Sequence, residues 1–291
     1  MRSALVFIIS ITLFGCADEQ VEHDATPAVV RVAVLPDQAR DRLIAKYEPL
    51  IHYLESATGL DLELSLPEDY SDLLDQFEAG RIDLAWFGGL TYVQAAQKSH
   101  AVAIAFRDID LEFTSCYVAK VADTRTTINE FAGESFSFGP KLSTSGHLMP
   151  RYFMTEEGLD PEKFFGPIRH SAGHDQTALW VNDGTVTLGV ANCFIVRSLF
   201  QSGELDSSDV RILETTPPYP DYVWTTHTSM KESARQALLD AFLGLDPTIA
   251  EHREILRTQG ANTYLPAGPP DFELVRTAAV RAGVLAEDSK E

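Results

Sequence analysis

The fold of this 291-residue chain is decided by residues 82–90, which read Ile-Asp-Leu-Ala-Trp-Phe-Gly-Gly-Leu. The run at 82–87, apolar except for Asp83, is typical of a buried strand, and the glycine pair after it predicts a turn into a helix that starts at Leu90. Residues 40–57 carry apolar side chains at the i, i+3, i+4 and i+7 positions of a helix, which Gly59 ends. Further strands are predicted at 31–36, 60–66 and 101–106, and a further helix at 70–78. This alternation predicts an α/β fold with a parallel or mixed sheet covered by helices on both faces.

A second series of strands and helices begins near Thr114. Strands are predicted at 115–121, 135–139, 168–171, 187–191, 210–214 and 222–226, and helices after Ser143, at 177–182 and at 194–201. The tail after them is predicted to be wholly helical, with helices at 231–243, 249–259 and 272–282. Since such a tail offers no strand to a second sheet, its helices are expected to cover the first one. The prediction is a discontinuous lobe I, residues 29–112 plus 223–291, with lobe II, residues 113–222, inserted between two crossing strands.

The chain is strongly acidic, with 43 Asp and Glu residues against 23 Lys and Arg residues and a formal net charge of -20. Nucleic-acid binding needs basic patches against phosphate, so this composition excludes it as a general activity. The same charge disfavours adhesion to anionic lipid through a basic face. Acidic clusters such as those at 69–72 and 108–110 are interpreted as solvated surface.

The N-terminus has the pattern of a secretory signal. Arg2 precedes an apolar run at 4–14, which is too short for a comfortable membrane span. The run ends in Leu-Phe-Gly-Cys, which resembles a bacterial lipoprotein signal whose cysteine is lipidated after cleavage. The alternative is an ordinary signal peptide with a chance cysteine. The prediction is a signal peptide at 1–15, a lipidated Cys16, a flexible tether at 16–28, and a periplasmic or cell-envelope protein that meets the membrane through its lipid only.

Two further cysteines, Cys116 and Cys193, lie in apolar, strand-like contexts. An exported chain meets an oxidising compartment, in which the two thiols could form a disulfide. Two separate buried thiols are about as consistent with the sequence. The spacing matches no zinc motif, and no metal site is predicted.

Several short segments carry a resemblance to a known family. They are Asp-Leu-Ala-Trp-Phe-Gly at 83–88, Phe-Gly-Pro at 138–140, Ser-Thr-Ser-Gly-His-Leu-Met-Pro at 143–150, Ser-Ala-Gly-His-Asp at 171–175, and residues 186–192. In this order and spacing the chain resembles the phosphonate, phosphite and phosphate-binding proteins of ABC transporters. The resemblance implies a type II periplasmic-binding-protein fold, in which each of two lobes is a mixed sheet flanked by helices and the ligand cleft lies between them. It also implies a monomer that binds a small oxyanion, needs no cofactor and docks on an ABC permease in the inner membrane.

Ser143, Thr144 and Ser145 open a predicted helix after a strand. Free backbone N–H groups at a helix start form an anion site, and three hydroxyls add donors that can rotate toward phosphonate oxygens. The alternative for the triplet is a plain helix cap. By the resemblance, His174 is the histidine that contacts the ligand, while the alternative is a capping or buried structural histidine. An anion held in this way sits inside a cleft, so the acidic exterior does not oppose it.

Five more residues complete the predicted ligand site. By the resemblance Tyr70 lines the cleft, and Asp175 places a carboxylate beside the histidine. Trp86 and Phe87 lie at a strand end, where open α/β sheets place ligand crevices, although either could belong to the hydrophobic core. By the resemblance, binders of aminoalkylphosphonates have a tyrosine at the position of Phe87, which has no hydroxyl. Asn192 is neutral at a position where an acidic residue could bind the amine of such a ligand. These departures favour a smaller oxyanion such as phosphite, methylphosphonate or phosphate.

No motif predicts catalysis. Ser145 is not in a G-x-S-x-G turn, the P-loop spacing is absent from the sequence, and no nucleophile has a partnered base. The predicted function is therefore the extracytoplasmic capture component of an ABC importer, whose lobes close on a phosphorus oxyanion. The alternative is a ligand-sensing lipoprotein that presents its bound oxyanion to a membrane sensor kinase.

Overall fold

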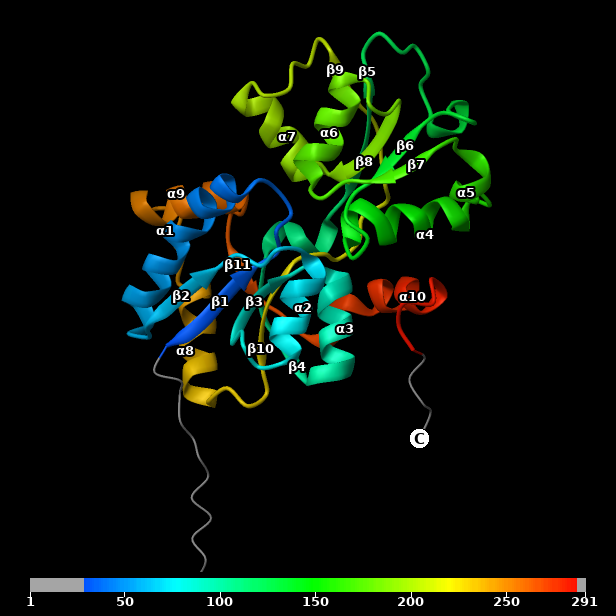
Figure 1. Cartoon of the computed structure of the whole chain (residues 1–291). Coiled ribbons are helices and arrows are strands. Elements are labelled where there is room, and N and C mark those ends of the chain that lie inside the picture. Colours follow the sequence, from blue (N-terminus) through cyan, green and yellow to red (C-terminus); the bar gives the residue numbers. More distant parts are fainter. Residues whose placement is uncertain (1–28, 287–291) are drawn as a thin grey trace, which may run out of the picture.

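Two separate mixed sheets form the framework of residues 29–286, the part of the chain that this computed structural model describes (Figure 1). The first sheet contains β1 (Val30–Val34), β2 (Leu62–Ser65), β3 (Leu84–Phe87), β4 (Ala101–Arg107), β10 (Val223–His227) and β11 (Tyr264–Pro266), in the spatial order β11-β4-β10-β3-β1-β2. The second contains β5 (Ser115–Lys120), β6 (Phe136–Phe138), β7 (Ile168–His170), β8 (Leu188–Asn192) and β9 (Val210–Thr215), in the order β7-β6-β8-β5-β9. Each sheet combines parallel and antiparallel pairs, which confirms the predicted α/β class with two mixed sheets.

Helices cover both faces of each sheet (Figure 1). Around the first sheet lie α1 (Arg40–Thr58), α2 (Tyr70–Glu78), α3 (Gly89–Ser99), α8 (Glu232–Leu243), α9 (Ala250–Gln259) and α10 (Glu273–Arg281), with the short helical turns η1 (Asp108–Glu112) and η4 (Pro269–Phe272). Around the second lie α4 (Met149–Glu156), α5 (Pro161–Phe164), α6 (His174–Asp183) and α7 (Cys193–Ser202), with the turns η2 (Ile128–Glu130) and η3 (Thr144–Leu148). The second sheet has a separate hydrophobic cluster on each face, one shared with α6 and α7 and the other shared with α4 and α5.

The strand at 84–87 is central and entirely buried, as its apolar run predicts. It pairs in parallel with β1 and antiparallel with β10, so both neighbours cover its backbone. The turn after it is made by Gly88, which caps α3 in an extended conformation. The preceding helix, α2, is capped by Asp69, whose side chain accepts a hydrogen bond of 2.8 Å from the Asp72 amide.

The chain passes between the two sheets twice, after β4 and again before β10. The two crossing segments pair with each other, because Phe113 and Tyr219 exchange backbone hydrogen bonds of 2.9 and 3.0 Å. We keep lobe I and lobe II as names for the halves built on the first and second sheet. The exact lobe boundaries at residues 112/113 and 222/223 stay a prediction.

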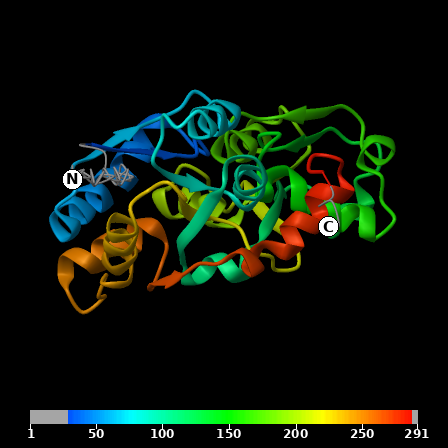
Figure 2. The same cartoon turned by 90° about the horizontal axis from the view of Figure 1, so that it is seen from below.

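The prediction of a wholly helical tail is wrong. Residues 264–266 form β11, which pairs antiparallel with β4 at the edge of the first sheet. A three-residue strand that ends in proline is too short to show alternation, and its place is set by backbone pairing with a distant strand. The last helix, α10, packs on α3 of lobe I and also reaches α4 of lobe II (Figures 1 and 2). There Arg281 forms an ion pair of 2.6 Å with Glu156.

One acidic cluster predicted to be solvated is partly buried. Asp110 in η1 is 1% exposed and holds the guanidinium of Arg107 through both carboxylate oxygens, at 2.5 and 2.9 Å. A buried arginine three residues before an aspartate supplies the charge that lets this carboxylate leave water.

A disulfide joins Cys116 to Cys193. It links β5 to the first turn of α7, and it decides between the two alternatives that the sequence left open. The predicted signal peptide, the lipidated Cys16 and the whole of the tether fall outside the described residues. Within residues 29–286, no helix combines the length and the apolar character that a membrane span requires.

Candidate functional site

Six helices of the described chain begin between the two lobes, each after a strand. They are α1, α2, α3, η3, α6 and α7, which follow β1, β2, β3, β6, β7 and β8. The carboxyl ends of strands in open α/β sheets are where ligand crevices form, and helix starts offer N–H groups to anions. The topology therefore brings polar helix starts from both lobes to one place.

The hydroxyls of the predicted triplet are buried at the start of η3, with Ser143, Thr144 and Ser145 each no more than 2% exposed. The Ser143 hydroxyl oxygen accepts a bond of 2.9 Å from the Gly146 amide. The Thr144 hydroxyl oxygen accepts one of 3.0 Å from the Leu90 amide of lobe I. Because both oxygens act as acceptors in these bonds, each hydroxyl still has one hydrogen to donate, and that of Thr144 has the Asp221 carboxyl group as a neighbouring acceptor. The hydroxyl of Ser145 has no hydrogen-bond partner of normal geometry in the described structure.

His174 lies at the first position of α6 and is fully buried. Its Nδ1 accepts a hydrogen bond of 3.1 Å from the Asn192 amide, so the neutral ring carries its proton on Nε2. Nε2 lies 3.3 Å from the Ser143 hydroxyl oxygen, on the side of η3. Burial lowers the pKa of His174 to about 4, and the ring is therefore a neutral donor at physiological pH.

Tyr70 begins α2 and directs a second buried hydroxyl toward the same place. Burial raises the pKa of Tyr70 well above its usual value, while the neighbouring Ser143 hydroxyl opposes this rise. The Tyr70 hydroxyl nevertheless has no partner with normal hydrogen-bond geometry in the described residues. Buried polar atoms are rarely left unpaired, so the unpaired hydroxyls of Tyr70 and Ser145 indicate a place where a ligand accepts hydrogen bonds.

Two aspartates that the sequence analysis did not single out belong to this cluster. Asp221 lies on the second crossing segment, 1% exposed, and its Oδ1 accepts a bond of 3.0 Å from the Gly89 amide. Its Oδ2 is buried without a partner in the described structure. Burial raises the pKa of Asp221 to about 7, and the Gly89 amide and the neighbouring Thr144 and Ser145 hydroxyls only partly offset this effect. A carboxyl group that is half protonated near neutral pH can share a proton with an oxyanion.

Asp37 follows β1 and connects three of the site residues. Its Oδ2 accepts a bond of 2.9 Å from the Tyr222 hydroxyl, and its backbone oxygen accepts one of 2.9 Å from the His174 amide. Asn192 donates from Nδ2 to the Tyr222 hydroxyl oxygen at 3.0 Å, while its Oδ1 caps α7. These bonds fix Asn192 and the His174 backbone. Its position directly after the first predicted strand could have indicated that Asp37 belongs to the site. Among 43 acidic residues, that single carboxylate does not stand out.

Asp175 stands beside the histidine, but backbone amides occupy both of its oxygens. Oδ2 accepts a bond of 2.9 Å from Ala39 and Oδ1 accepts one of 2.8 Å from Gln176. The predicted carboxylate is therefore at the cleft, and its hydrogen bonds go to the protein backbone.

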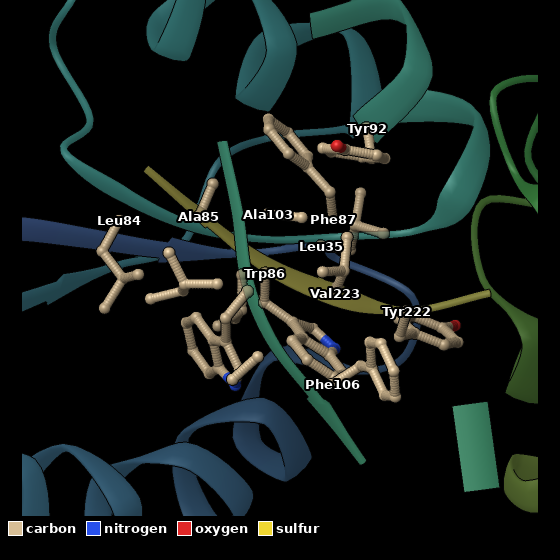
Figure 3. Close-up of a cluster of buried hydrophobic side chains, with 14 of the residues drawn as sticks. Leu35, Leu84, Ala85, Trp86, Phe87, Tyr92, Ala103, Phe106, Tyr222 and Val223 are labelled. Carbon is tan, nitrogen blue, oxygen red and sulfur yellow. The ribbon is translucent and has the colours of Figure 1, made fainter. Parts of the chain in front are cut away.

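Trp86 and Phe87 lie in the hydrophobic core of lobe I, at 1% and 0% exposure. As neighbours on a strand they point to opposite faces of the sheet, Trp86 on the side of Tyr222 and Phe87 on the side of Tyr92 (Figure 3). Trp86 stacks on the Tyr222 ring at 5.4 Å between centroids, and the hydroxyl of the same tyrosine bonds to Asp37. Phe87 packs edge to face on Phe77 at 5.1 Å. The structure thus brings Trp86 next to the site through Tyr222, and it places Phe87 in the core.

Chemically, the cluster offers hydroxyl and imidazole donors around a partly protonated carboxyl group, an arrangement suited to binding an oxyanion. In residues 29–286, no three side chains of His, Cys, Asp or Glu come together as a candidate metal site.

Comparisons with known proteins agree with this geometry. Residues 32–272 match the family described as ABC transporter, phosphonate, periplasmic substrate-binding protein. The chain is 29% identical to the probable ABC transporter phosphite binding protein PhnD1 of Prochlorococcus marinus, over 86% of this chain and 88% of that protein. It is also 29% identical to the phosphate-import protein PhnD of Mycolicibacterium smegmatis, over 64% and 62% of the two chains.

A solved structure of Prochlorococcus marinus PhnD1 in complex with methylphosphonate superposes with a TM-score of 0.83. The two chains are 26% identical, and the match covers 89% of this chain and 100% of that one. The mixed sheets, the two lobes and the family match lead to one conclusion: this chain belongs to the periplasmic substrate-binding proteins of phosphonate ABC transporters.

Proposed function

We propose that this protein captures a small phosphorus oxyanion between its lobes and delivers it to an ABC permease. The observation that carries the proposal is the pair of buried hydroxyls on Tyr70 and Ser145, which have no partner of normal geometry in the described residues and lie beside the buried hydroxyls of Ser143 and Thr144 and the imidazole of His174. Relatives named for phosphite and phosphate, and a related structure with methylphosphonate, support the same ligand class.

The donors of the proposed site are neutral, which suits an anion that keeps one proton. Hydroxyls and a neutral imidazole supply hydrogen bonds, and Asp221 exchanges a proton with the ligand. Phosphite, methylphosphonate and phosphate all offer such a proton near neutral pH.

The proposal extends to the setting of the protein. We place it in the cell envelope as a monomer, held by a lipid on Cys16, with binding and release as its activity in place of catalysis. The Leu-Phe-Gly-Cys sequence at 13–16 supports the anchor, and the family supports the periplasmic location.

Calorimetric titration of the purified protein with methylphosphonate, phosphite and phosphate tests the proposal. We expect saturable binding of at least one of them, and we expect Ser145→Ala to weaken it by about 5-fold to 150-fold, the effect of losing one buried hydrogen bond of roughly 1–3 kcal/mol. Ser56→Ala is the matched control, because Ser56 is exposed on α1 and its hydroxyl donates to the His52 carbonyl oxygen, away from the site. An absence of heat with all three anions up to millimolar concentration contradicts the proposal.

Affinity is expected to depend on pH through Asp221. Its pKa is raised to about 7 in the empty site, and a bound anion favours the protonated form further. Binding therefore takes up a proton, so affinity is highest below pH 7 and falls by up to about tenfold per pH unit above it. Asp221→Asn stays neutral and should remove this dependence, leaving only that of the ligand. Titrations from pH 5.5 to 8.5 check the ratio of the two affinities, and a constant ratio rejects the role of Asp221.

A further inference from the structure

The two lobes are fastened to each other at the mouth of the site by a reciprocal pair of hydrogen bonds. The His174 amide of lobe II donates to the Asp37 backbone oxygen of lobe I at 2.9 Å. The Ala39 amide of lobe I donates to Oδ2 of Asp175 of lobe II at 2.9 Å. We call these four residues the latch. Since each bond joins the two lobes, both bonds break when the lobes separate.

Asp175 is built into the latch. It is 8% exposed, and its second carboxylate oxygen accepts a bond of 2.8 Å from the Gln176 amide within its own helix. Because one oxygen accepts from an amide of lobe I and the other from an amide of lobe II, the carboxylate bridges the start of α6 to the start of α1. A carboxylate whose two oxygens both accept amide hydrogens is held in one orientation.

Gly173 allows the close approach that the latch requires. A Cβ atom at this position would lie 2.8 Å from Oδ1 of Asp175 and 3.1 Å from the Asp37 backbone oxygen. Only a residue without a side chain lets the loop before α6 come this near to lobe I.

The latch lies between an open groove and the buried hydroxyls of η3. On its outer side lies a groove of about 630 Å³ between the lobes, lined among others by Ala39, Glu68, Gly173, Asp175 and Trp180. On its inner side, His174 joins the buried hydroxyls of η3 through Ser143. A ligand bound among those hydroxyls is therefore separated from the groove by the latch.

We propose that Asp175 is a positioning residue, which holds the lobes closed over the ligand by bonding to the Ala39 amide and makes no hydrogen bond to the ligand itself. This inference rests on the proposed function, since it assumes that an oxyanion binds inside the latch. A bond that exists only in the closed form stabilises the bound state against opening. It acts on ligand release, and it leaves the first encounter with the open form unchanged.

Removing the latch bond from either lobe provides the test. Asp175→Ala deletes the acceptor. Ala39→Pro deletes the donor, and the Ala39 φ of -56° suits proline. With methylphosphonate as the probe, each variant is expected to dissociate about 10-fold to 100-fold faster in stopped-flow measurements, at an unchanged association rate. The double variant should dissociate methylphosphonate no faster than the faster of the two single variants, because both changes remove the same bond.

Two controls separate the latch from a structural defect. Ala39→Gly keeps the amide hydrogen and should dissociate methylphosphonate at nearly the wild-type rate. Thermal unfolding of each variant without ligand shows whether the fold is intact. If the wild-type protein binds methylphosphonate but Asp175→Ala releases it at the wild-type rate, or if the two single effects add, the latch is rejected and the proposed function stands. If the wild-type protein binds no phosphorus oxyanion, both proposals are rejected.

Discussion

Gly146→Ala is expected to lower the affinity for methylphosphonate by roughly 100-fold, since it disturbs two donors worth about 1–1.5 kcal/mol each. A Cβ atom at Gly146 would lie 2.8 Å from Cε1 of His174, 3.0 Å from the Cα of Gly139 and 3.1 Å from the Ser143 hydroxyl oxygen. The Gly139 contact is to backbone and cannot yield easily. The imidazole is held from its other side by the Asn192 amide, at 3.1 Å from Nδ1. The ring and the hydroxyl must therefore move apart, and both belong to the proposed site.

The same substitution should lower the free energy of unfolding by about 1–3 kcal/mol, the usual effect of overpacking. Gly203→Ala is the control. Its Cβ would meet open space, but its φ of 78° makes an alanine strained. That variant should therefore lose stability and keep its affinity. Calorimetric titration and denaturant unfolding of both variants separate the two effects. Wild-type affinity in Gly146→Ala would show that the ligand does not bind against His174 and Ser143.

Replacing both cysteines of the disulfide, in the variant Cys116→Ala with Cys193→Ala, should lower the free energy of unfolding by about 4 kcal/mol. The two cysteines are 77 residues apart. In the loop-closure description, a cross-link of this span lowers the entropy of the unfolded chain, which raises the free energy of unfolding by about 4 kcal/mol. Urea unfolding of the variant and of the oxidised wild-type protein measures the difference.

The disulfide also supports the site. In the pairing of β5 with β8, Ser115 lies opposite Asn192, and each of these residues directly precedes one of the cysteines. The Ser115 hydroxyl donates to the Ser145 backbone oxygen at 2.6 Å, so β5 also positions the η3 triplet. We therefore expect the double variant to bind methylphosphonate more weakly as well. Reductant should lower the stability of the wild-type protein and leave that of the variant unchanged, and equal unfolding free energies without reductant would show two free thiols.

The fold could be predicted because its signals are local. A run such as 82–87, apolar except for Asp83, is typical of a buried strand or a short buried helix, and the glycines after it favour the strand. Repetition of that pattern predicts mixed sheets with helices on both faces. The three-residue β11 escaped prediction, because its partner β4 lies more than 150 residues earlier in the chain and nothing within residues 264–266 indicates the pairing.

The site could be predicted only in part, for a similar reason. A helix start rich in hydroxyls is visible in the sequence, and Ser143 to Ser145 do lie together with His174 and Tyr70 between the lobes. Asp221 gives no local sign, since it becomes part of the site only where the second crossing segment meets the start of α3.

Burial of charged groups was a second property that could not be predicted from the sequence. Asp37 and Asp110 look like members of an acidic surface until Tyr222 and Arg107 are found beside them. The amino-acid composition describes the whole chain, and it does not predict which carboxylates are buried. The partners that stabilise a buried carboxylate are distant in sequence for Asp37 and only three residues away for Asp110.

A crystal structure of the protein with methylphosphonate is the most direct test of ligand binding between the lobes. We expect the phosphonate to lie buried there, with its oxygens within hydrogen-bond distance of the Tyr70 hydroxyl, the Ser145 hydroxyl and Nε2 of His174. Methylphosphonate found instead in the groove outside Asp175, or no bound ligand between the lobes at saturating concentration, would contradict it.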